Sequence, residues 1–357
     1  MKLLMTADAV GGVWQYSTDL AVALGAHGVE TVIAVLGPAP TDAQRSTLAG
    51  CEAVTLVETG LMLDWLVNGP EPVRTAAATI GNLASEIGAD LVHLNSPVLA
   101  TGRSYPVPLV AAAHGCVATW WDAARGEALP PEFAWHEAMM REGLSAADAV
   151  VAPSRSYAAT VVRRYGLPRL PHAVHNGRTP LPLANAQPAS WACTAGRLWD
   201  RVKNTELLDR VAARVPIRAA GPVTAPHGET VATQHLDLLG TLDAPALGRE
   251  LAGRPVFVSA ASFEPFGLAV LEAAQAGCPL VLADIDTFRE LWSDAAIFVQ
   301  REDEYVSAIE RLLADPTERV AWGERARGRA MRYTPGAAAT AMMALYAELL
   351  PAKRVAA

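Results

Sequence analysis

Two glutamates, Glu264 and Glu272, lie eight positions apart where the sequence predicts the start of a buried helix. Residues 256–259 before them form an apolar run typical of a short buried strand, and the alanine-rich run after them ends at Gly277. One glutamate therefore opens the helix and the other lies inside it. Carboxylates placed in this way can hold hydroxyl groups or stabilise positive charge, which makes the segment the first candidate for chemistry.

Glu272 shares one face of the expected helix with Leu268, Leu271 and Gln275, because these positions follow the i, i+3, i+4, i+7 spacing. A buried carboxylate is costly unless hydrogen-bond donors meet it, and the hydroxyls of a sugar or ribose are suitable donors. The backbone N–H groups at Gly267 and Leu268 point out of the helix start, where they favour a phosphate. An isolated pair of glutamates is more often a solvated helix residue and a loop acid, so other motifs must decide.

Strands and helices alternate along both halves of the chain, which predicts two parallel sheets joined by a proline-rich linker. In the first half the expected strands are 3–5, 31–36, 53–57, 91–94, 109–113, 149–152 and 173–174, and the expected helices are 16–26, 72–87, 132–144 and 157–165. In the second half the expected strands are 191–195, 217–220, 236–239, 256–259, 280–283 and 296–299, and a final helix is expected at 337–350.

Further candidate residues follow the ends of these strands. Gly11 and Gly12 follow the first strand, His114 follows the fifth, and Arg197 follows the first strand of the second half. Parallel sheets bind ligands at the carboxyl ends of their strands, so the series predicts a shared cleft as the active site. Alone, a histidine after a strand or a glycine pair in a turn is more often structural.

The segment 262–272 resembles the Glu-x7-Glu signature of the retaining nucleotide-sugar glycosyltransferases of family four, the glycogen-synthase-like group with the GT-B fold. The likeness covers nearly the whole chain in the expected order. Its other parts are the glycine-rich loop Gly11-Gly12-Val13-Trp14, His114 after its strand, and Gly196-Arg197-Leu198 with Lys203-Asn204.

The resemblance implies an α/β protein of the GT-B fold, with two Rossmann-like doubly wound domains, a cleft between them and a C-terminal crossover helix. The length of 357 residues is comfortable for two such domains. We expect an N-terminal acceptor-side domain at 1–178, a linker at 179–190, a C-terminal nucleotide-sugar-binding domain at 191–333, and a helix at 334–357 that crosses back to the first domain.

The resemblance also implies roles for the glutamate segment. Glu264 is expected to hold hydroxyls of the donor sugar and, as a catalytic residue, to stabilise positive charge on its ring. Glu272 is expected to hold the ribose hydroxyls. The amides around Phe266, Gly267 and Leu268 are expected to receive the diphosphate.

Three more residues complete the expected catalytic set. Arg197 and Lys203 are expected to neutralise the negative charge that builds on the leaving diphosphate, without a metal ion. A structural ion pair is the alternative for each. His114 is expected to approach the sugar from the first domain, and Gly11 and Gly12 to form the acceptor-side loop.

Two departures from the family pattern leave roles open. The family lysine usually follows the arginine by five residues, whereas Lys203 follows Arg197 by six, so Arg201 competes with Lys203 for the diphosphate. After Asn176-Gly177 the family usually has Val-Asp, but this chain has Arg178-Thr179. The second departure weakens any assignment of a role there.

The expected reaction moves a sugar from a nucleoside-diphosphate sugar, with UDP or GDP favoured, to a hydroxyl acceptor with retained configuration and without metal or cofactor. Retention in the family is described as front-face attack, in which the leaving diphosphate oxygen helps to take the acceptor proton, so no protein nucleophile is assigned. Asp284-Ile285-Asp286 mimics a metal motif and is expected to serve a turn and a helix N-cap. The alternatives are an epimerase or phosphorylase of the same fold and a non-catalytic sugar-nucleotide-binding protein.

The acceptor stays open among carbohydrates, lipids, proteins and small molecules. Aromatic faces suit sugar rings and lipid chains, and a cluster of such residues follows His114, although core packing is their commoner role. The cluster consists of Trp120, Trp121, Asp122, Trp135 and His136.

The composition narrows the partners and the compartment. The chain has 29 basic and 37 acidic residues, and its net charge of −8 argues against a nucleic-acid partner. Four cysteines without metal-type spacing suit reduced thiols. The first apolar run is too short for a signal peptide, and no window approaches the ~20 apolar residues of a membrane span. We expect a cytoplasmic protein, with peripheral contact at the inner membrane face left open.

Overall fold

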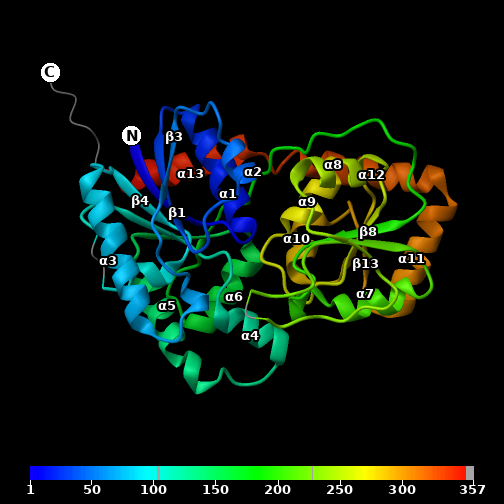
Figure 1. Cartoon of the computed structure of the whole chain (residues 1–357), viewed down its shortest axis with the longest axis horizontal. Coiled ribbons are helices and arrows are strands. Elements are labelled where there is room, and N and C mark those ends of the chain that lie inside the picture. The colour runs from blue at the N-terminus through cyan, green and yellow to red at the C-terminus, as the bar shows by residue number, and fades with distance from the viewer. Residues whose placement is uncertain (103–104, 227, 351–357) are drawn as a thin grey trace. The chain divides into compact units, whose positions relative to one another are not determined.

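The computed structural model describes residues 1–102, 105–226 and 228–350 (Figure 1). Its contacts divide the chain into two compact units. The first comprises Met1–Asp122, Gly126–Gly177 and the chain from Pro335, and the second comprises Ala123–Arg125 and Arg178–Thr334. Positions 351–357 of the expected terminal helix lie outside the described residues.

Within the described residues, the first unit contains a seven-stranded parallel sheet in the order β3-β2-β1-β4-β5-β6-β7. The chain builds outward from β1 to β3 and then returns to the other side of β1 for β4, which creates a switch point between β1 and β4. Ligand sites of doubly wound sheets lie at the carboxyl ends of the strands beside such a point. The strands are β1 (Lys2–Asp8), β2 (Glu30–Leu36), β3 (Val54–Glu58), β4 (Leu91–Leu94), β5 (Leu109–Ala112), β6 (Ala149–Ala152) and β7 (His172–Ala173).

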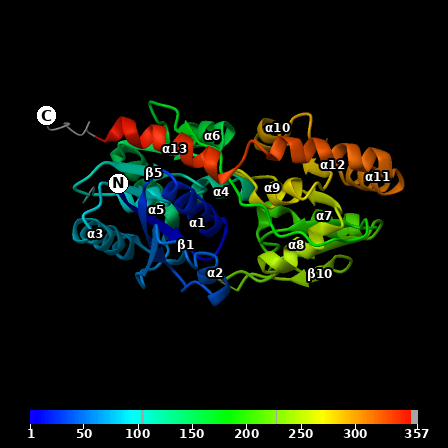
Figure 2. The same cartoon turned by 90° about the horizontal axis from the view of Figure 1, so that it is seen from above.

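The helices of the first unit include the last helix of the chain, α13, drawn in red in Figures 1 and 2. Ala339, Met342 and Tyr346 of α13 are buried in one hydrophobic cluster with Tyr16 and Leu20 of α1. The helices are α1 (Gly12–Gly25), α2 (Asp42–Ser46), α3 (Pro70–Glu86), α4 (Val117–Arg125), α5 (Ala134–Ala146), α6 (Arg155–Tyr165) and α13 (Pro335–Leu349), with short 3-10 helices η1 (Asp64–Leu66), η2 (Pro97–Ala100) and η3 (Pro131–Phe133). The C-terminal helix thus completes the core of the first unit.

The second unit contains a six-stranded parallel sheet in the order β10-β9-β8-β11-β12-β13, again within the described residues. Its central strand β11 alternates between two hydrophobic clusters, because Phe257 belongs to one and Val256 and Val258 belong to the other. Both faces of the sheet are therefore covered, as expected for parallel strands. The strands are β8 (Ala192–Ala195), β9 (Ile217–Ala220), β10 (Asp237–Gly240), β11 (Val256–Ser259), β12 (Leu280–Ala283) and β13 (Ile297–Val299).

Helices of the second unit supply those two clusters. Residues of α9, α10 and α12 pack with Phe257, and residues of α7 and α11 pack with Val256 and Val258. Proline in the first turn favours the starts of α8 and α12, where its missing N–H costs nothing. The helices are α7 (Thr205–Ala212), α8 (Ala244–Ala252), α9 (Leu268–Gln275), α10 (Asp286–Trp292), α11 (Glu302–Ala314) and α12 (Pro316–Ala330), with the 3-10 helix η4 (Arg201–Lys203).

The predicted α/β fold with two Rossmann-like sheets is confirmed. The expected strands at 91–94, 217–220 and 256–259 have the bounds of β4, β9 and β11. Helix α4 was not expected, because it is short and its tryptophan pair gives no clear period; it ends at Gly126, whose φ of 65° suits glycine. Across the described residues, no helix is both long and apolar enough to span a membrane.

Candidate active site

Two loops of the second unit are joined by hydrogen bonds at the carboxyl edge of its sheet. The loop after β8 carries Val202, whose carbonyl accepts a 2.9 Å hydrogen bond from the amide of Ser262 in the loop after β11. In the first loop, Arg197 Nη2 donates to Asp200 Oδ2 at 2.9 Å, and the Asp200 side chain is 2% exposed. The backbone of Gly196, at the start of the first loop, packs directly against Gly221, where a Cβ would lie 1.7 Å from the Gly196 carbonyl oxygen. These contacts fix the backbone that carries the basic side chains.

The joined loops bring Lys203 and Glu264 together, although 61 positions separate them in the sequence. The ammonium of Lys203 donates to Glu264 Oε2, and the two side chains are 23% and 16% exposed. Arg201, the competing candidate, is exposed, and the Arg197 side chain, which is also exposed, pairs with Asp200 instead. The structure therefore brings Lys203, not Arg201, to the first glutamate of the signature.

Gly267 turns the chain between the two glutamates. Its φ of 93° lies in the left-handed region, and a Cβ would come within 3.3 Å of both Glu264 Cγ and a ring carbon of Phe288. Gly267 is the N-cap of α9 and has no side chain to cap the first turn. Leu268 begins the helix, and the buried Phe266 ring lies against Tyr333 with centroids 5.7 Å apart. The amides at the start of α9 are thus held in place by packing on both sides.

Glu272 lies one turn further along α9, and its side chain is 11% exposed. The sequence predicted that this carboxylate needs a hydrogen-bond donor but did not identify one within the chain. Arg178 supplies it, because its Nε donates to Glu272 Oε1 at 2.7 Å. Arg178 follows Asn176-Gly177, where the family usually has Val-Asp, and it lies 94 positions before its partner Glu272.

In the first unit, Gly11 and Gly12 start α1 at the carboxyl end of β1. The side chain of Asp8 organises this turn, since Oδ1 accepts hydrogen bonds from the amides of Val10 at 2.9 Å and Gly11 at 3.3 Å. The amide of Gly11 therefore serves the turn itself. Gly12 is the first helical residue, where backbone N–H groups lack partners within the helix.

His114 follows β5 and is held by Asn95, which follows β4. Asn95 Nδ2 donates to the carbonyl of Thr6 at 2.6 Å and to Ser17 Oγ at 2.9 Å, which identifies the other amide atom as oxygen. That oxygen lies 2.9 Å from His114 Nε2, so this nitrogen carries the proton. Burial lowers the pKa of His114 to about 4, so the ring is neutral near pH 7 and its Nδ1 is a hydrogen-bond acceptor.

A second histidine, His93, lies in the middle of β4 and is fully buried. Its Nδ1 is 2.6 Å from the hydroxyl of Tyr346 in α13, and its Nε2 is 3.4 Å from the hydroxyl of Tyr16 in α1. The Tyr16 ring packs edge-on against His114, with centroids 4.3 Å apart. Burial lowers the pKa of His93 to about 3, with a further contribution from nearby His114. A neutral, buried network therefore supports His114.

The structure accounts for His136 in the aromatic cluster after His114. His136 is part of the core, because its side chain is 2% exposed and its Nε2 lies 2.7 Å from Asp64 Oδ2. Trp120 and Trp121 of α4 are only partly buried, and Trp121 packs against Phe133 with centroids 5.8 Å apart. Core packing thus accounts for His136, and an acceptor role for the tryptophans stays a prediction.

Comparisons with known families match the chain in two places. The model described as Glycosyltransferase Family 4 matches residues 10–179, and the model described as Glycosyl transferases group 1 matches residues 229–329. Together they span well over half of the chain; the first match lies almost wholly in the first unit and the second lies in the second unit. The chain is a family 4 glycosyltransferase of the GT-B type. The curated proteins contain no sequence match.

Solved structures share the fold of this glycosyltransferase over nearly its whole length. Sucrose-phosphate synthase from Thermosynechococcus elongatus has a TM-score of 0.80 at 18% identity, covering 98% of this chain and 99% of that one. HepE from Anabaena, solved in complex with UDP-glucose, has a TM-score of 0.72 at 17% identity, covering 98% and 100%. WaaG, a glycosyltransferase involved in lipopolysaccharide biosynthesis, has a TM-score of 0.68 at 15% identity, covering 95% and 98%.

A turn and a helix N-cap were expected at Asp284-Ile285-Asp286, and Ile285 is the N-cap of α10 in this glycosyltransferase, without a side-chain capping hydrogen bond. The Asp284 carboxylate instead accepts two hydrogen bonds from Arg289, at 2.6 and 2.8 Å, because the arginine fork matches both oxygens. In the described part of the chain, no group of His, Cys, Asp and Glu side chains is arranged to hold a metal ion.

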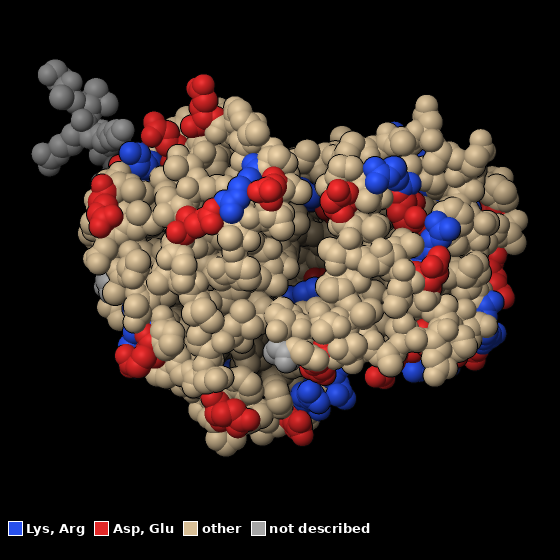
Figure 3. Space-filling model, in the orientation of Figure 1, with Lys and Arg blue, Asp and Glu red and all other residues tan. Residues whose placement is uncertain are grey.

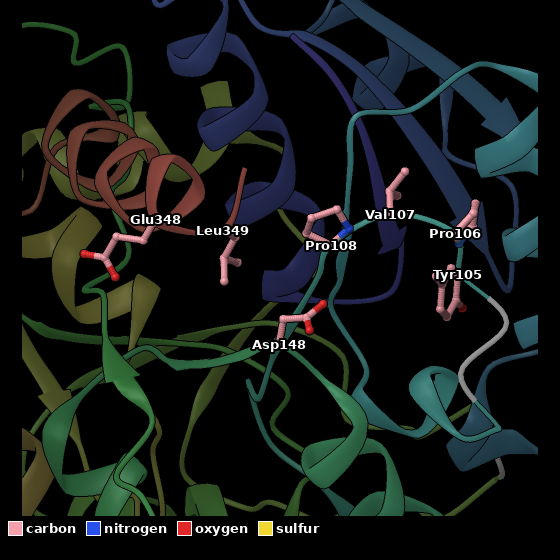
Figure 4. Close-up of a pocket in the computed structure, with 7 residues that line it drawn as sticks. All are labelled: Tyr105, Pro106, Val107, Pro108, Asp148, Glu348 and Leu349. Atoms are coloured by element: carbon pink, nitrogen blue, oxygen red, sulfur yellow. The ribbon is translucent and has the colours of Figure 1, made fainter. Parts of the chain in front are cut away.

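A pocket of about 390 Å³ in the first unit has no candidate residue of the glycosyltransferase among the seven residues that line it (Figure 4). Pro108 and Asp148 line it, and they immediately precede β5 and β6. The pocket is therefore at the amino edge of the sheet, opposite Gly11 and His114.

On the face drawn in Figure 3, basic and acidic side chains of the described residues are interspersed, without a large patch of one sign.

Sequence reasoning missed several supporting residues of the glycosyltransferase, among them His93, Asn95 and Tyr346. His93 interrupts the apolar strand Leu91–Leu94, and a polar residue inside a buried strand is a signal that can be read from sequence. Asn95 follows the same strand and marks its carboxyl end. Tyr346 gives no such signal, because an aromatic residue in an apolar helix predicts only core packing.

Proposed function

We propose that this glycosyltransferase is a retaining, metal-independent enzyme that moves a sugar from a nucleoside-diphosphate sugar to a hydroxyl acceptor. The observation that carries the proposal is the pairing of Lys203 with Glu264 beside the uncapped start of α9. A cation, a carboxylate and a helix N-terminus at one place match a donor that has a diphosphate on one side and sugar hydroxyls on the other.

Lys203 is assigned to the diphosphate. Its ammonium exchanges the carboxylate of Glu264 for phosphate oxygens when the donor binds, and Arg197, which is 46% exposed, adds a second cation. Amides around Phe266, Gly267 and Leu268 receive the remaining phosphate oxygens. Positive charge and backbone donors directed at the leaving group favour the transition state, because negative charge grows there as the bond breaks.

Glu264 is assigned to the sugar. Once released by Lys203, its carboxylate accepts hydrogen bonds from sugar hydroxyls and opposes the positive charge that develops on the ring. His114 keeps the role expected from the sequence, and the acceptor lone pair of its Nδ1 suits a sugar hydroxyl, since Nε2–H is engaged by Asn95. Gly11 and Gly12 keep their expected role on the acceptor side.

Retention is assigned to front-face attack. The bond between the anomeric carbon and the diphosphate oxygen breaks, the acceptor oxygen forms its bond on the same face, and the acceptor proton passes to the leaving diphosphate. The step needs no protein nucleophile. UDP and GDP are the favoured nucleotides, and the complex of HepE with UDP-glucose supports UDP first. Cytoplasmic location, peripheral membrane contact and the acceptor class stay predictions.

A two-stage experiment tests this function. Thermal-shift measurements with UDP, GDP, ADP, CMP and dTDP identify a nucleotide that raises the unfolding temperature, because a ligand of the folded state stabilises it by mass action. The matching nucleotide sugars are then incubated with carbohydrate, lipid and small-molecule acceptors in the presence of a metal chelator. Proton NMR of the product reports the configuration at the anomeric carbon.

Retained configuration with chelator present is the expected result. Inverted configuration, or activity that chelator abolishes, contradicts the proposal. A changed nucleotide sugar formed without acceptor identifies an epimerase instead. Binding without transfer across the whole acceptor panel favours a non-catalytic sugar-nucleotide-binding protein.

A further inference from the structure

Arg178 is held at three points by the second unit. Its amide donates to the carbonyl of Tyr333 at 3.3 Å, and its carbonyl accepts from Gln275 Nε2 at 2.7 Å. Its Nε donates to Glu272 Oε1 at 2.7 Å. Glu272 and Gln275 both belong to α9, so the backbone and the side chain of Arg178 are fixed to the helix that begins at the proposed diphosphate site.

The pair of Arg178 and Glu272 is largely removed from water, with side chains 14% and 11% exposed. A carboxylate in such a place requires a counter-charge, and the planar guanidinium fixes its direction as well as its charge. A carboxylate has two oxygens with about four acceptor positions, and the hydrogen bond from one arginine does not occupy all of them. The pairing with Arg178 is therefore compatible with hydroxyl donors on the same carboxylate.

The position of Glu272 on α9 suits a nucleotide. It follows Leu268 by four residues, so both lie on one face of the helix with a rise of about 6 Å between them. Side chains of a helix lean toward its N-terminus, which brings the carboxylate closer to the start of α9. A diphosphate at that start therefore places its ribose beside Glu272 and close to Arg178.

We propose that Arg178 is a donor-positioning residue that directs the Glu272 carboxylate to the ribose hydroxyls of a nucleoside diphosphate. This inference rests on the proposed function, because it concerns the same donor. Without the guanidinium, the carboxylate loses the hydrogen bond that fixes its direction and a positive charge that offsets its own near the anionic diphosphate. Arg178 thereby sets how strongly the enzyme distinguishes a ribonucleotide from an analogue without ribose hydroxyls.

Calorimetric titration tests the role directly. The probes are the nucleoside diphosphate that binds in the thermal-shift screen and its 2′,3′-dideoxy analogue. For the wild-type protein we expect the ribonucleotide to bind about tenfold or more tightly, because two hydrogen bonds to a charged group are lost in the analogue. For Arg178→Met we expect ribonucleotide affinity to fall about tenfold and the preference to shrink to within about twofold, as it should in Glu272→Gln.

A matched control is available in the same unit. Arg210 and Glu302 form an ion pair of the same kind, with Nε and Oε2 2.9 Å apart, but the side chains are 57% and 37% exposed. Arg210→Met should leave both affinities unchanged, since exposed pairs contribute little. Arg178→Lys keeps the charge. In this variant the ratio of ribonucleotide affinity to dideoxy-analogue affinity should fall at least threefold, because a single ammonium does not reproduce the guanidinium geometry.

The outcomes separate this inference from the proposed function. Wild-type protein that binds none of the nucleotides overturns both. Wild-type protein that binds nucleotide without ribose preference, or Arg178→Met that weakens both probes equally, overturns only the role of Arg178. If Arg178→Met does not fold, an unchanged preference in Arg178→Lys overturns the inference in its place.

Discussion

The candidate residues of the two units differ in charge. In the second unit they are ionic and paired, as Lys203 is with Glu264 and Arg178 is with Glu272. In the first unit His114 is neutral and is fixed by Asn95 and by the ring of Tyr16. His114 and the Lys203–Glu264 pair both follow the carboxyl ends of parallel strands, so the difference comes from the side chains and not from the architecture.

Under the proposed function, the ionic residues suit the diphosphate of the donor, and the neutral His114 suits a sugar hydroxyl. A diphosphate needs cations and backbone N–H groups, and cations that are paired before binding can exchange one anion for another. Sugar hydroxyls need neutral donors and acceptors in fixed positions, which buried hydrogen bonds provide. If this assignment is correct, mutation of Lys203 or Glu264 should lower turnover more than mutation of His114.

The largest effect is expected at Lys203. Lys203→Met removes a cation directed at the leaving diphosphate, so turnover should fall about 10²- to 10³-fold. Arg201→Met should change turnover less than about threefold, because this side chain is exposed and apart from the Glu264 pair. Steady-state rates of product formation decide between them, and the reverse order would assign the diphosphate to Arg201.

A smaller but still large effect is expected at Glu264. Glu264→Gln keeps the size of the side chain and removes the charge that opposes the sugar cation, so kcat should fall about 10²-fold. The change in KM should be smaller, because the neutral amide still accepts a hydrogen bond from a sugar hydroxyl. Near-normal turnover with the correct acceptor would remove Glu264 from the mechanism.

His114 is expected to contribute about tenfold. His114→Ala removes one neutral hydrogen-bond acceptor, which corresponds to about 1.4 kcal/mol. Because burial lowers the pKa of His114 to about 4, the ring stays neutral down to that pH. The profile of kcat/KM between pH 5 and 9 should therefore show no histidine limb near 6.5, and a limb that disappears in His114→Ala would contradict the neutral assignment.

The last prediction concerns stability rather than rate and belongs to His93. Its pKa is lowered to about 3 in the folded protein against 6.5 in an unfolded chain, so only the unfolded state takes up this proton as the pH falls. Its full contribution is present above pH 6.5 and declines below it, by at most about 1.4 kcal/mol per pH unit. Urea unfolding from pH 7.5 to 5 measures the decline, and His93→Gln should make it shallower. An equal slope in the variant would show that His93 is not responsible.

Much of the fold was accessible from local sequence. Alternating apolar runs and helical patterns are local properties, and they predicted β4, β9 and β11 with their observed bounds. Helix α1 begins at Gly12, four residues before the expected start. The sequence did not predict this first turn, because glycine adds nothing to the apolar periodicity from which the helix was predicted. The i, i+3, i+4, i+7 spacing likewise predicted that Glu272 lies on the buried face of α9. Glu264 was expected to open this helix, but it lies in the loop before the N-cap Gly267, because the left-handed turn at Gly267 delays the helix start to Leu268.

The partners of the candidate residues were not accessible in this way. Lys203 and Glu264 are 61 positions apart, and Arg178 and Glu272 are 94 positions apart. The order of strands in the second sheet places β8 beside β11, and this order brings the loops that follow them together. A pattern within one segment contains no information about a contact that depends on strand order.

The sequence by itself determined an α/β chain with acids, bases and glycines at the ends of parallel strands, because side-chain periodicity and turn chemistry act over a few residues. Only the tertiary structure decided that Lys203 rather than Arg201 meets Glu264, that Arg178 meets Glu272, and that His93 is neutral. These properties depend on burial and on distances between remote segments. Burial sets the cost of a charge, and packing of the whole unit sets burial.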